Sequence, residues 1–148
     1  MNKILSCFIA LLLMSNVIVA YSQSNKPIPD PRLKEVFSES KIANLMEVAP
    51  EKISYYNLLL TSYCSVEKSA PANGVFKGDV STINAKPGSS WTIDANTFDI
   101  NTFNMLKFKI PLELNNKIYY TIGKTGDFLV FISISEFSNI NKSKNTSK

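Results

Sequence analysis

A change in hydrophobic spacing near Tyr63 constrains the fold of this 148-residue chain more than any other feature of its sequence. Before Tyr63, apolar residues recur every three or four positions, as they do on the buried face of a helix. After it come short β-rich runs, and the clearest of them alternate apolar and polar residues, as strands with one wet face do. Helices followed by strands predict an α+β fold, with N-terminal helices packed on a C-terminal antiparallel β-meander.

The helical half is expected to begin at Asp30 and Pro31, because Asp is a favoured N-cap and Pro suits the first helical position. Two apolar stripes follow, and the phase change between them at residues 38–40 predicts a kink or two short helices. A further helix is expected over residues 50–62, opened by Pro50. The first stripe comprises Leu33, Val36 and Phe37, and the second comprises Ile42, Leu45, Met46 and Ala49.

The strands of the meander are expected over residues 106–114, 117–122 and 128–135, joined by tight turns. In the first of these, Phe108, Ile110 and Leu112 should enter the core. Pro111 indicates an edge position or a bulge there, because proline cannot donate to the ladder. Earlier in this half we expect a short strand over 75–80, a candidate strand over 91–94 and irregular turns over 98–103.

Residues 1–22 have the pattern of a secretory signal peptide. Lys3 precedes an apolar stretch over residues 4–20, and small residues mark a cleavage point before Gln23, with a cut after Ala20 as the alternative. The apolar stretch is shorter than a spanning helix needs. We therefore expect export, followed by a single α+β domain over residues 23–140 and no membrane span after cleavage.

The charge of the expected mature chain is concentrated at its C-terminus. Residues 23–140 contain 12 basic and 12 acidic residues, whereas residues 141–148 contain three lysines and no acid. A nucleic-acid binder should show a basic stripe on the fold itself, so we expect no nucleic-acid partner. The segment 141–148 is predicted to be a disordered basic tail.

The absence of histidine restricts the chemistry available to this chain. Hydrolases that use Ser-His-Asp or Cys-His pairs, zinc sites with histidine ligands and a histidine general base are all excluded. Cys64 is the one cysteine that remains after cleavage, and it is expected to be a small buried hydrophobic residue. Residues 123–126 resemble parts of phosphate-binding and β-lactamase motifs, but they lack the required flanking pattern and predict a hairpin turn.

Carboxylates are the remaining candidates for catalysis or metal binding. Asp94 and Asp99 each begin an Asp-x-Asn sequence, but neither stretch supplies the oxygen ligand and glycine that a calcium loop needs next. Such residues more often hydrogen-bond their own turns. A pair of carboxylates, Glu47 with Glu51 or Asp94 with Asp99, could in principle hydrolyse a glycosidic bond. No catalytic residue, metal ligand or cofactor is assigned.

Four residues are candidates for contact with a partner: Tyr55, Tyr119, Lys107 and Lys109. Tyr55 and Tyr119 each stand beside a second tyrosine, so one ring of each pair must point away from the other. The outward rings either cover the edge of the core or form a contact patch, since Tyr is enriched at interfaces. The two lysines alternate with core positions on a strand whose free edge could receive a partner strand.

Three stretches resemble small exported proteins of the Bacteroidota. They are Ala49-Pro50-Glu51-Lys52-Ile53-Ser54-Tyr55-Tyr56-Asn57, Phe103-Asn104-Met105-Leu106-Lys107-Phe108 and Tyr119-Tyr120-Thr121-Ile122. Such proteins often begin with Gln after cleavage, as Gln23 would allow. The resembling motifs are hydrophobic and not catalytic. The resemblance therefore implies a Gram-negative envelope location, in the periplasm, at the outer-membrane periphery or on the cell surface, and no functional residue.

The leading functional hypothesis is a non-enzymatic envelope protein that binds another envelope protein as an accessory subunit of an outer-membrane assembly. The alternative is a small-ligand binding domain with a pocket between helices and sheet. A small carboxylate-based hydrolase is the third hypothesis. An exposed sheet edge or aromatic patch would favour the first, a buried aromatic pocket the second, and two convergent carboxylates the third.

The export hypothesis predicts where the mature protein begins. N-terminal sequencing of the protein recovered without detergent should find Gln23 or Tyr21 as the first residue. A Ser22→Arg change should impair cleavage while translocation continues, because it alters the cleavage point and not the apolar stretch. Recovery of chains that keep Met1 in a membrane fraction would contradict the hypothesis.

Overall fold

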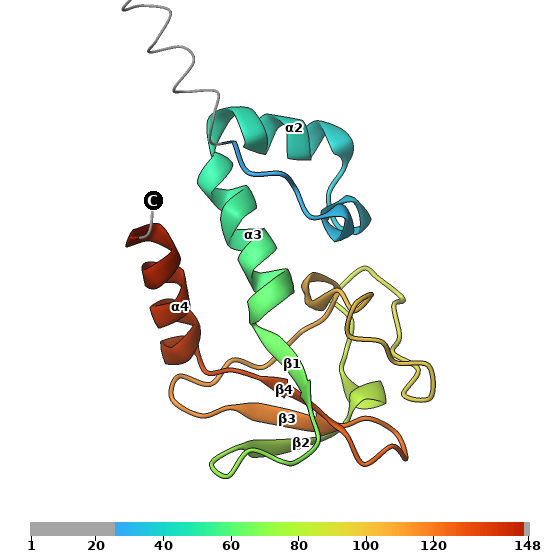
Figure 1. Ribbon diagram of the computed structural model, residues 1–148. Helices are drawn as coiled ribbons and strands as arrows, with labels where there is room; N and C mark the ends of the chain where they lie inside the picture. The colour runs from blue at the N-terminus through green and yellow to red at the C-terminus, as the bar shows by residue number, and fades with distance from the viewer. Residues whose placement is uncertain (1–25, 147–148) are drawn as a thin grey trace, which may run out of the picture.

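The computed structural model describes residues 26–146, so the expected signal peptide lies outside the described residues. The described chain has the predicted α+β class, with α-helices at one end and a sheet at the other (Figure 1). Its elements, with η for a short 3-10 helix, are η1 (Pro31–Glu35), α2 (Glu39–Val48), α3 (Pro50–Ser62), β1 (Cys64–Glu67), β2 (Val75–Asp79), η2 (Val80–Thr82), η3 (Met105–Lys107), β3 (Ile118–Thr121), β4 (Phe128–Phe131) and α4 (Ile134–Thr146).

The N-terminal helices begin at the residues that the sequence indicates. The Asp30 carboxylate accepts a hydrogen bond from the Arg32 N–H at the start of η1. The Ser38 hydroxyl accepts one from the Lys41 N–H and starts α2, which confirms the predicted break at residues 38–40. Pro50 opens α3, which matches the predicted helix. In Figure 1, α2 packs across α3 and lies away from the sheet, whereas α3 meets the sheet at its C-terminal end. The predicted packing of the N-terminal helices on the sheet is therefore confirmed only in part.

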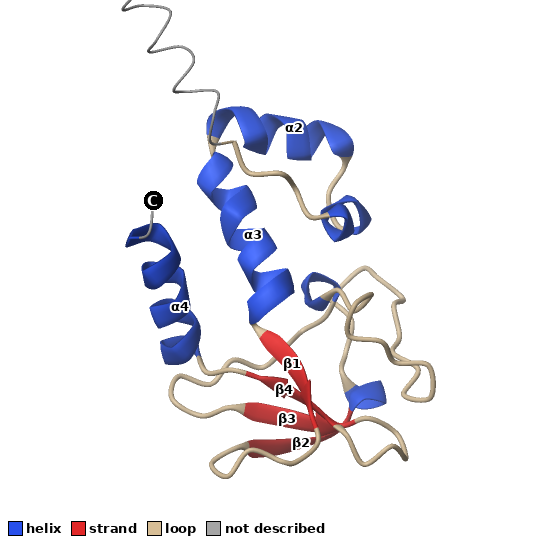
Figure 2. Cartoon of the chain, in the orientation of Figure 1, coloured by secondary structure: helices blue, strands red, loops and turns tan. Residues whose placement is uncertain are grey.

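A mixed sheet replaces the expected antiparallel meander (Figure 2). The strand order is β1-β4-β3-β2, in which β4 pairs antiparallel with both β1 and β3 while β2 pairs parallel with β3. The β3–β4 hairpin confirms two of the expected strands in part, and β2 confirms the short strand over 75–80. Strand β1 was not predicted, because four residues that lead into a Pro- and Gly-containing loop give a weak strand signal.

The predicted strand over residues 106–114 is wrong. The Asn104 side-chain oxygen accepts a hydrogen bond from the Leu106 N–H, and residues 105–107 form η3. The chain then passes through a single antiparallel bridge between Ala85 and Phe108. Phe108 is buried, but Leu112 is 59% exposed. The alternation of apolar and polar residues over 106–114 therefore does not mark a strand with one buried face. The candidate strand over 91–94 is also wrong, since those residues form a loop.

Helix α4 corrects two further expectations. Strand β4 ends at Phe131, because the Ser133 hydroxyl accepts a hydrogen bond from the Glu136 N–H and the Phe137 N–H donates to the Ser133 carbonyl. Residues 141–146, predicted to be part of a disordered tail, continue this helix. No helix within residues 26–146 has both the length and the hydrophobicity needed to cross a membrane.

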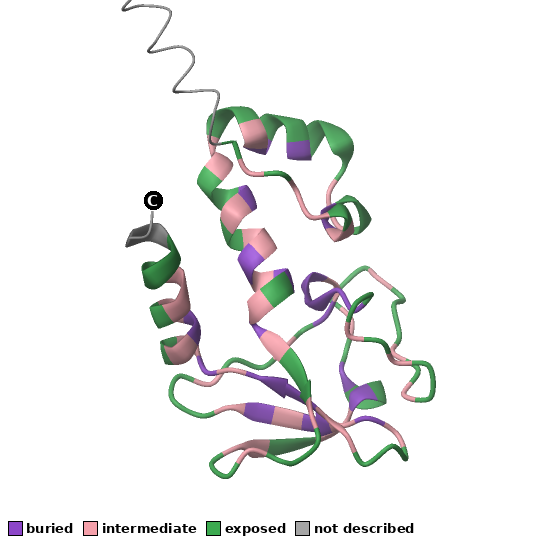
Figure 3. Ribbon diagram, viewed as in Figure 1, coloured by how far each residue is buried: buried purple, intermediate pink, exposed green. Residues whose placement is uncertain are grey.

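The core is centred on Phe131, which is fully buried. Its ring lies 6.2 Å from Tyr63, 6.3 Å from Phe103 and 6.2 Å from Tyr120, measured between ring centroids. These contacts connect the end of α3, the long connection before β3 and the sheet. Figure 3 shows buried positions along α3 and across β3 and β4. The burial of so many aromatic rings supplies much of the driving force for folding.

A polar clamp joins the N-terminal segment to η3; we define it as Asp30, Arg32, Asn57 and Asn104. The Arg32 guanidinium donates to both Asp30 carboxylate oxygens and, at 3.0 Å, to the Phe103 carbonyl. The Asn104 amide donates to the Arg32 carbonyl at 2.7 Å. Asn57 on α3 accepts from the Asp30 N–H at 2.8 Å. The clamp therefore ties α3, η1 and η3 together.

The clamp predicts a pH-dependent stability. Hydrogen bonding to the Arg32 side chain lowers the pKa of Asp30 below its ordinary value. A carboxyl with a lowered pKa in the folded state stabilises the fold above its ordinary pKa, and this contribution is lost as the pH falls through the lower value. Asp30→Asn should therefore cost about 2 kcal/mol of unfolding free energy at pH 7.

Urea denaturation from pH 7 down to pH 2 measures this effect. The stabilities of Asp30→Asn and the unchanged chain should converge at the acidic end, where the native carboxyl also carries a proton. The control is Glu47→Gln, which alters an exposed carboxyl on α2. A difference between Asp30→Asn and the unchanged chain that persists at pH 2 would contradict the assignment.

Candidate functional site

The four predicted contact residues occupy three separate places. Tyr55 on α3 and Lys109 in the segment after η3 line the same groove. Lys107 and Tyr119 lie outside it, the first beside η1 and the second on β3. The structure thus brings together one predicted tyrosine and one predicted lysine, from opposite sides of a groove.

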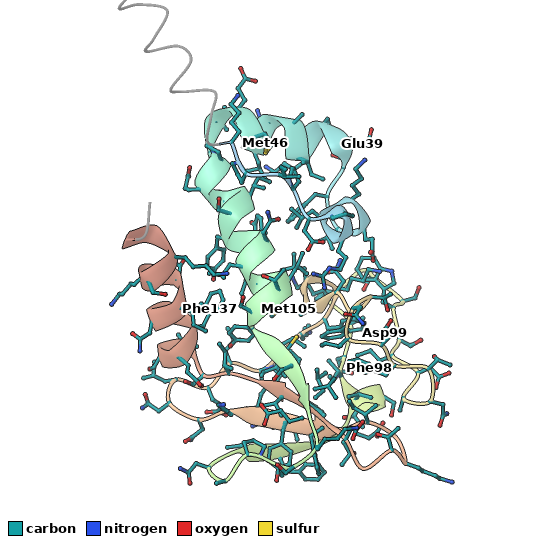
Figure 4. All side chains as sticks on the ribbon, in the orientation of Figure 1. Glu39, Met46, Phe98, Asp99, Met105 and Phe137 are labelled. Carbon is teal, nitrogen blue, oxygen red and sulfur yellow. The ribbon has the colours of Figure 1, made fainter. Side chains whose placement is uncertain are left out.

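This groove, which we call the α3–α4 groove, lies between α3, α4 and residues 105–112 and has a volume of about 460 Å³. Figure 4 shows the labelled Phe137 side chain between α4 and α3, with Met105 near the lower end of α3. The apolar lining residues from the two helices are Tyr55, Leu59, Tyr63, Ile134 and Phe137. Those from residues 105–112 are Met105, Leu106, Phe108, Ile110 and Leu112.

The floor of the groove follows from helical spacing. Tyr55, Leu59 and Tyr63 stand four residues apart, so they lie along one side of α3 and its C-terminal end. Phe137 meets them from α4, with its ring centroid 5.8 Å from Tyr55 and 5.1 Å from Tyr63 in edge-on contacts. Tyr63 and Phe137 are buried, and burial raises the pKa of Tyr63. The floor is therefore a fixed, uncharged aromatic surface.

The rim of the groove combines exposed apolar groups with two lysines. Tyr55 is 44% exposed and Leu112 is 59% exposed. Lys86 and Lys109 are exposed, and among the described residues neither has an ion-pair partner. No carboxylate lines the groove. The site can therefore receive an apolar group that carries negative charge at one end.

Lys107 forms contacts within the molecule that the sequence analysis did not predict. Its ammonium group forms an ion pair with Glu35 on η1 and lies 4.9 Å from the centroid of the Trp91 ring. Its side chain is only 20% exposed. A lysine paired with a carboxylate and stacked on an indole is already engaged within the molecule, so it offers little to a partner.

Tyr119 belongs to an aromatic row on the outer face of the sheet. Its ring centroid lies 5.4 Å from Phe76 on β2 and 5.6 Å from Phe128 on β4. Phe76 is 55% exposed, whereas Tyr119 and Phe128 are partly buried. The row is a second apolar surface of the molecule, separate from the residues that line the α3–α4 groove.

The candidate carboxylates are engaged in their own turns. The carboxylates of Asp94 and Asp99 accept hydrogen bonds from the backbone N–H groups of Asn96 and Asn101, each at 2.9 Å. Both aspartates line a hollow of about 190 Å³ beside Trp91. Within the described residues, no group of three or more acidic or cysteine side chains could hold a metal ion. Glu47 and Glu51 are exposed on the helices.

Several residues that line the groove were not predicted from the sequence to be contact residues. Leu112 was assigned to the core, and Ile134 was assigned to a strand. Lys86 was not identified as a candidate contact residue. The spacing of Ile134, Phe137 and Ile140, three residues apart, is the signal that could have indicated a helix with one apolar side.

The buried thiol of Cys64 yields a prediction. Burial raises the pKa of Cys64 to about 12, so almost no thiolate exists at neutral pH, and thiolate is the nucleophilic form. In a Cys7→Ser background, a disulfide-exchange reagent at pH 8 should react with Cys64 at least about 100-fold more slowly in the folded chain than in urea. Similar rates in the two states would show a reactive thiol.

The α3–α4 groove thus combines a mostly apolar lining with two rim lysines that have no ion-pair partner among the described residues. Its walls come from two helices and from the segment that follows η3. Its function has to be inferred from these residues. No protein-family model, curated protein or solved structure matches the chain.

Proposed function

We propose that this chain is a non-enzymatic, exported protein of the cell envelope that binds another envelope protein through the α3–α4 groove, as an accessory subunit of an outer-membrane assembly. The observation that carries the proposal is the pairing of exposed Tyr55 and Leu112 across a floor of buried aromatic rings. The signal-peptide pattern at residues 1–22 supports the envelope location.

The composition of the groove favours a protein partner. Binding energy at interfaces is concentrated in a few aromatic residues that lie in well-packed surroundings, and Tyr is among the commonest of them. Tyr55 has this setting, because its ring packs edge-on against Phe137 and still presents almost half of its surface to solvent. An apolar surface rimmed by charge is typical of interaction sites.

A small apolar ligand is the second candidate occupant. The groove volume of about 460 Å³ is that of a small-molecule site, and four aromatic side chains line it. Its open rim distinguishes it from the buried pocket that such a ligand would favour. The carboxylate-based hydrolase has weaker support: Asp94 and Asp99 line one hollow, but each carboxylate already accepts a hydrogen bond from its own turn.

Site-specific photo-crosslinking in the native host tests the partner proposal. A benzoylphenylalanine in place of Tyr55 or Leu112 should crosslink to one protein of defined mass in the envelope fraction. The same group in place of Val48, which is 66% exposed at the end of α2, should give no such product. Lys109→Glu should reduce the Leu112 crosslink by roughly tenfold, about 1.4 kcal/mol, since it reverses a rim charge.

Lys124→Glu is the matched control for Lys109→Glu. Lys124 is an exposed lysine in the β3–β4 turn and does not line the groove. Its reversal changes the net charge by the same amount and should leave the crosslink intact. Equal crosslinking from Tyr55 and Val48, or equal effects of the two lysine variants, would contradict the groove as the binding surface.

A further inference from the structure

We infer that the occupant of the α3–α4 groove is an extended, acidic peptide segment that pairs with the backbone of Ile110 and Leu112 and places alternate apolar side chains in the groove. This inference rests on the proposed function, because it specifies the part of the partner that binds. It is carried by three features of the groove: unpaired backbone groups, unpaired lysines and an apolar floor.

The segment after η3 presents one unpaired backbone edge. Phe108 has extended backbone angles, with φ −116° and ψ 160°, and the next N–H, that of Lys109, donates to the Asn84 carbonyl at 2.8 Å. In the part of the chain that the structure describes, the N–H and C=O groups of Ile110 and Leu112 have no hydrogen-bond partner. An extended segment of another chain can supply those partners by adding a strand.

Pro111 does not block this pairing. Successive residues of an extended chain direct their backbone N–H and C=O groups to opposite edges. Lys109 uses the edge that faces Asn84. If the backbone stays extended as it is at Phe108, Pro111 shares that edge, and Ile110 and Leu112 use the other one. The missing N–H of Pro111 therefore falls away from the free edge, which is where proline is tolerated in an edge strand.

The charge of the groove selects an acidic segment. Lys86 and Lys109 lie on opposite sides of a short antiparallel pairing, in which the Lys86 N–H donates to the Lys107 carbonyl at 2.9 Å. Neither lysine has an ion-pair partner among the described residues, whereas Lys77, Lys107 and Lys117 each have one. A carboxylate on the bound segment would meet two cations and no competing acid.

The floor explains the expected spacing of apolar side chains. An extended peptide directs every second side chain to the same face. If its backbone follows Ile110 and Leu112, that face meets the buried aromatic floor formed by Tyr63 and Phe137. A volume of about 460 Å³ holds two or three such side chains. A binding segment should therefore carry apolar residues at positions i and i+2, with Asp or Glu nearby.

Selection of random heptapeptides displayed on phage against the purified chain provides the probe. The enriched sequences should share apolar residues at alternate positions and at least one acidic residue, and a synthetic peptide of the leading sequence is then titrated by fluorescence anisotropy. Leu112→Pro removes one N–H from the free edge and should weaken binding by tenfold or more. The matched variant Leu112→Ala keeps that N–H and should weaken binding threefold at most.

Charge and peptide variants complete the test. Lys86→Glu and Lys109→Glu should each weaken binding about tenfold, whereas Lys124→Glu should leave it unchanged. N-methylation of the synthetic peptide, one position at a time, should abolish binding at every second position, because those N–H groups pair with the protein. This last series alters no protein residue, so it holds even if Leu112→Pro fails to fold, which circular dichroism would reveal.

Four outcomes would overturn the inference. They are a selected consensus with helical spacing, equal binding by Leu112→Pro and Leu112→Ala with both folded, N-methyl effects without alternation, and enrichment of no peptide. A crosslink from Tyr55 to a partner, together with any of these outcomes, would retain the proposed function and reject the extended peptide. Loss of the crosslink would reject the proposed function itself.

Discussion

The arrangement of the molecule depends on the ionic hydrogen bonds around Arg32. The Arg32 side chain is only 17% exposed, so its charge requires the Asp30 carboxylate and the Phe103 carbonyl as partners. Asn104 returns a hydrogen bond to the Arg32 carbonyl. Because Phe103 and Asn104 immediately precede η3, this one cluster fixes where the groove wall begins. The connection between β2 and β3 contains only two short 3-10 helices, and these hydrogen bonds fix its position near residues 103–104.

The groove forms beside the aromatic core, because Tyr63 contacts both the core and the groove residue Phe137. Phe131 packs against Tyr63 and Phe103 at the centre, and Phe137 then packs against Tyr63 from α4. Helix α4 contacts α3 along one side, and the segment after η3 passes on the other. Helix α4 and the segment after η3 thus lie on two sides of Tyr63, and the hollow between them has an aromatic floor. The binding surface and the core therefore share side chains.

The sequence predicts local elements better than it predicts their assembly. The cap at Asp30, the phase change at residues 38–40 and the proline at position 50 indicated where three helices begin, because these signals act over one or two turns. Strand β1 and the parallel partner of β3 depend on pairing between distant residues, which spacing along the chain does not encode. The same limit applies to the groove. Tyr55 and Lys109 were identified as outward residues, but Lys86 and Leu112 become neighbours of the site only through the path after η3.

The parallel pairing of β2 with β3 has a consequence for the order of folding. Parallel strands cannot be joined by a tight turn, and here residues 80–117 form the connection between them. Closing so long a loop costs conformational entropy before any native contact compensates for it. The β3–β4 hairpin is local and can form early, whereas the wall over residues 105–112 becomes fixed only when the loop closes. We therefore expect the groove to be among the last surfaces to form during folding.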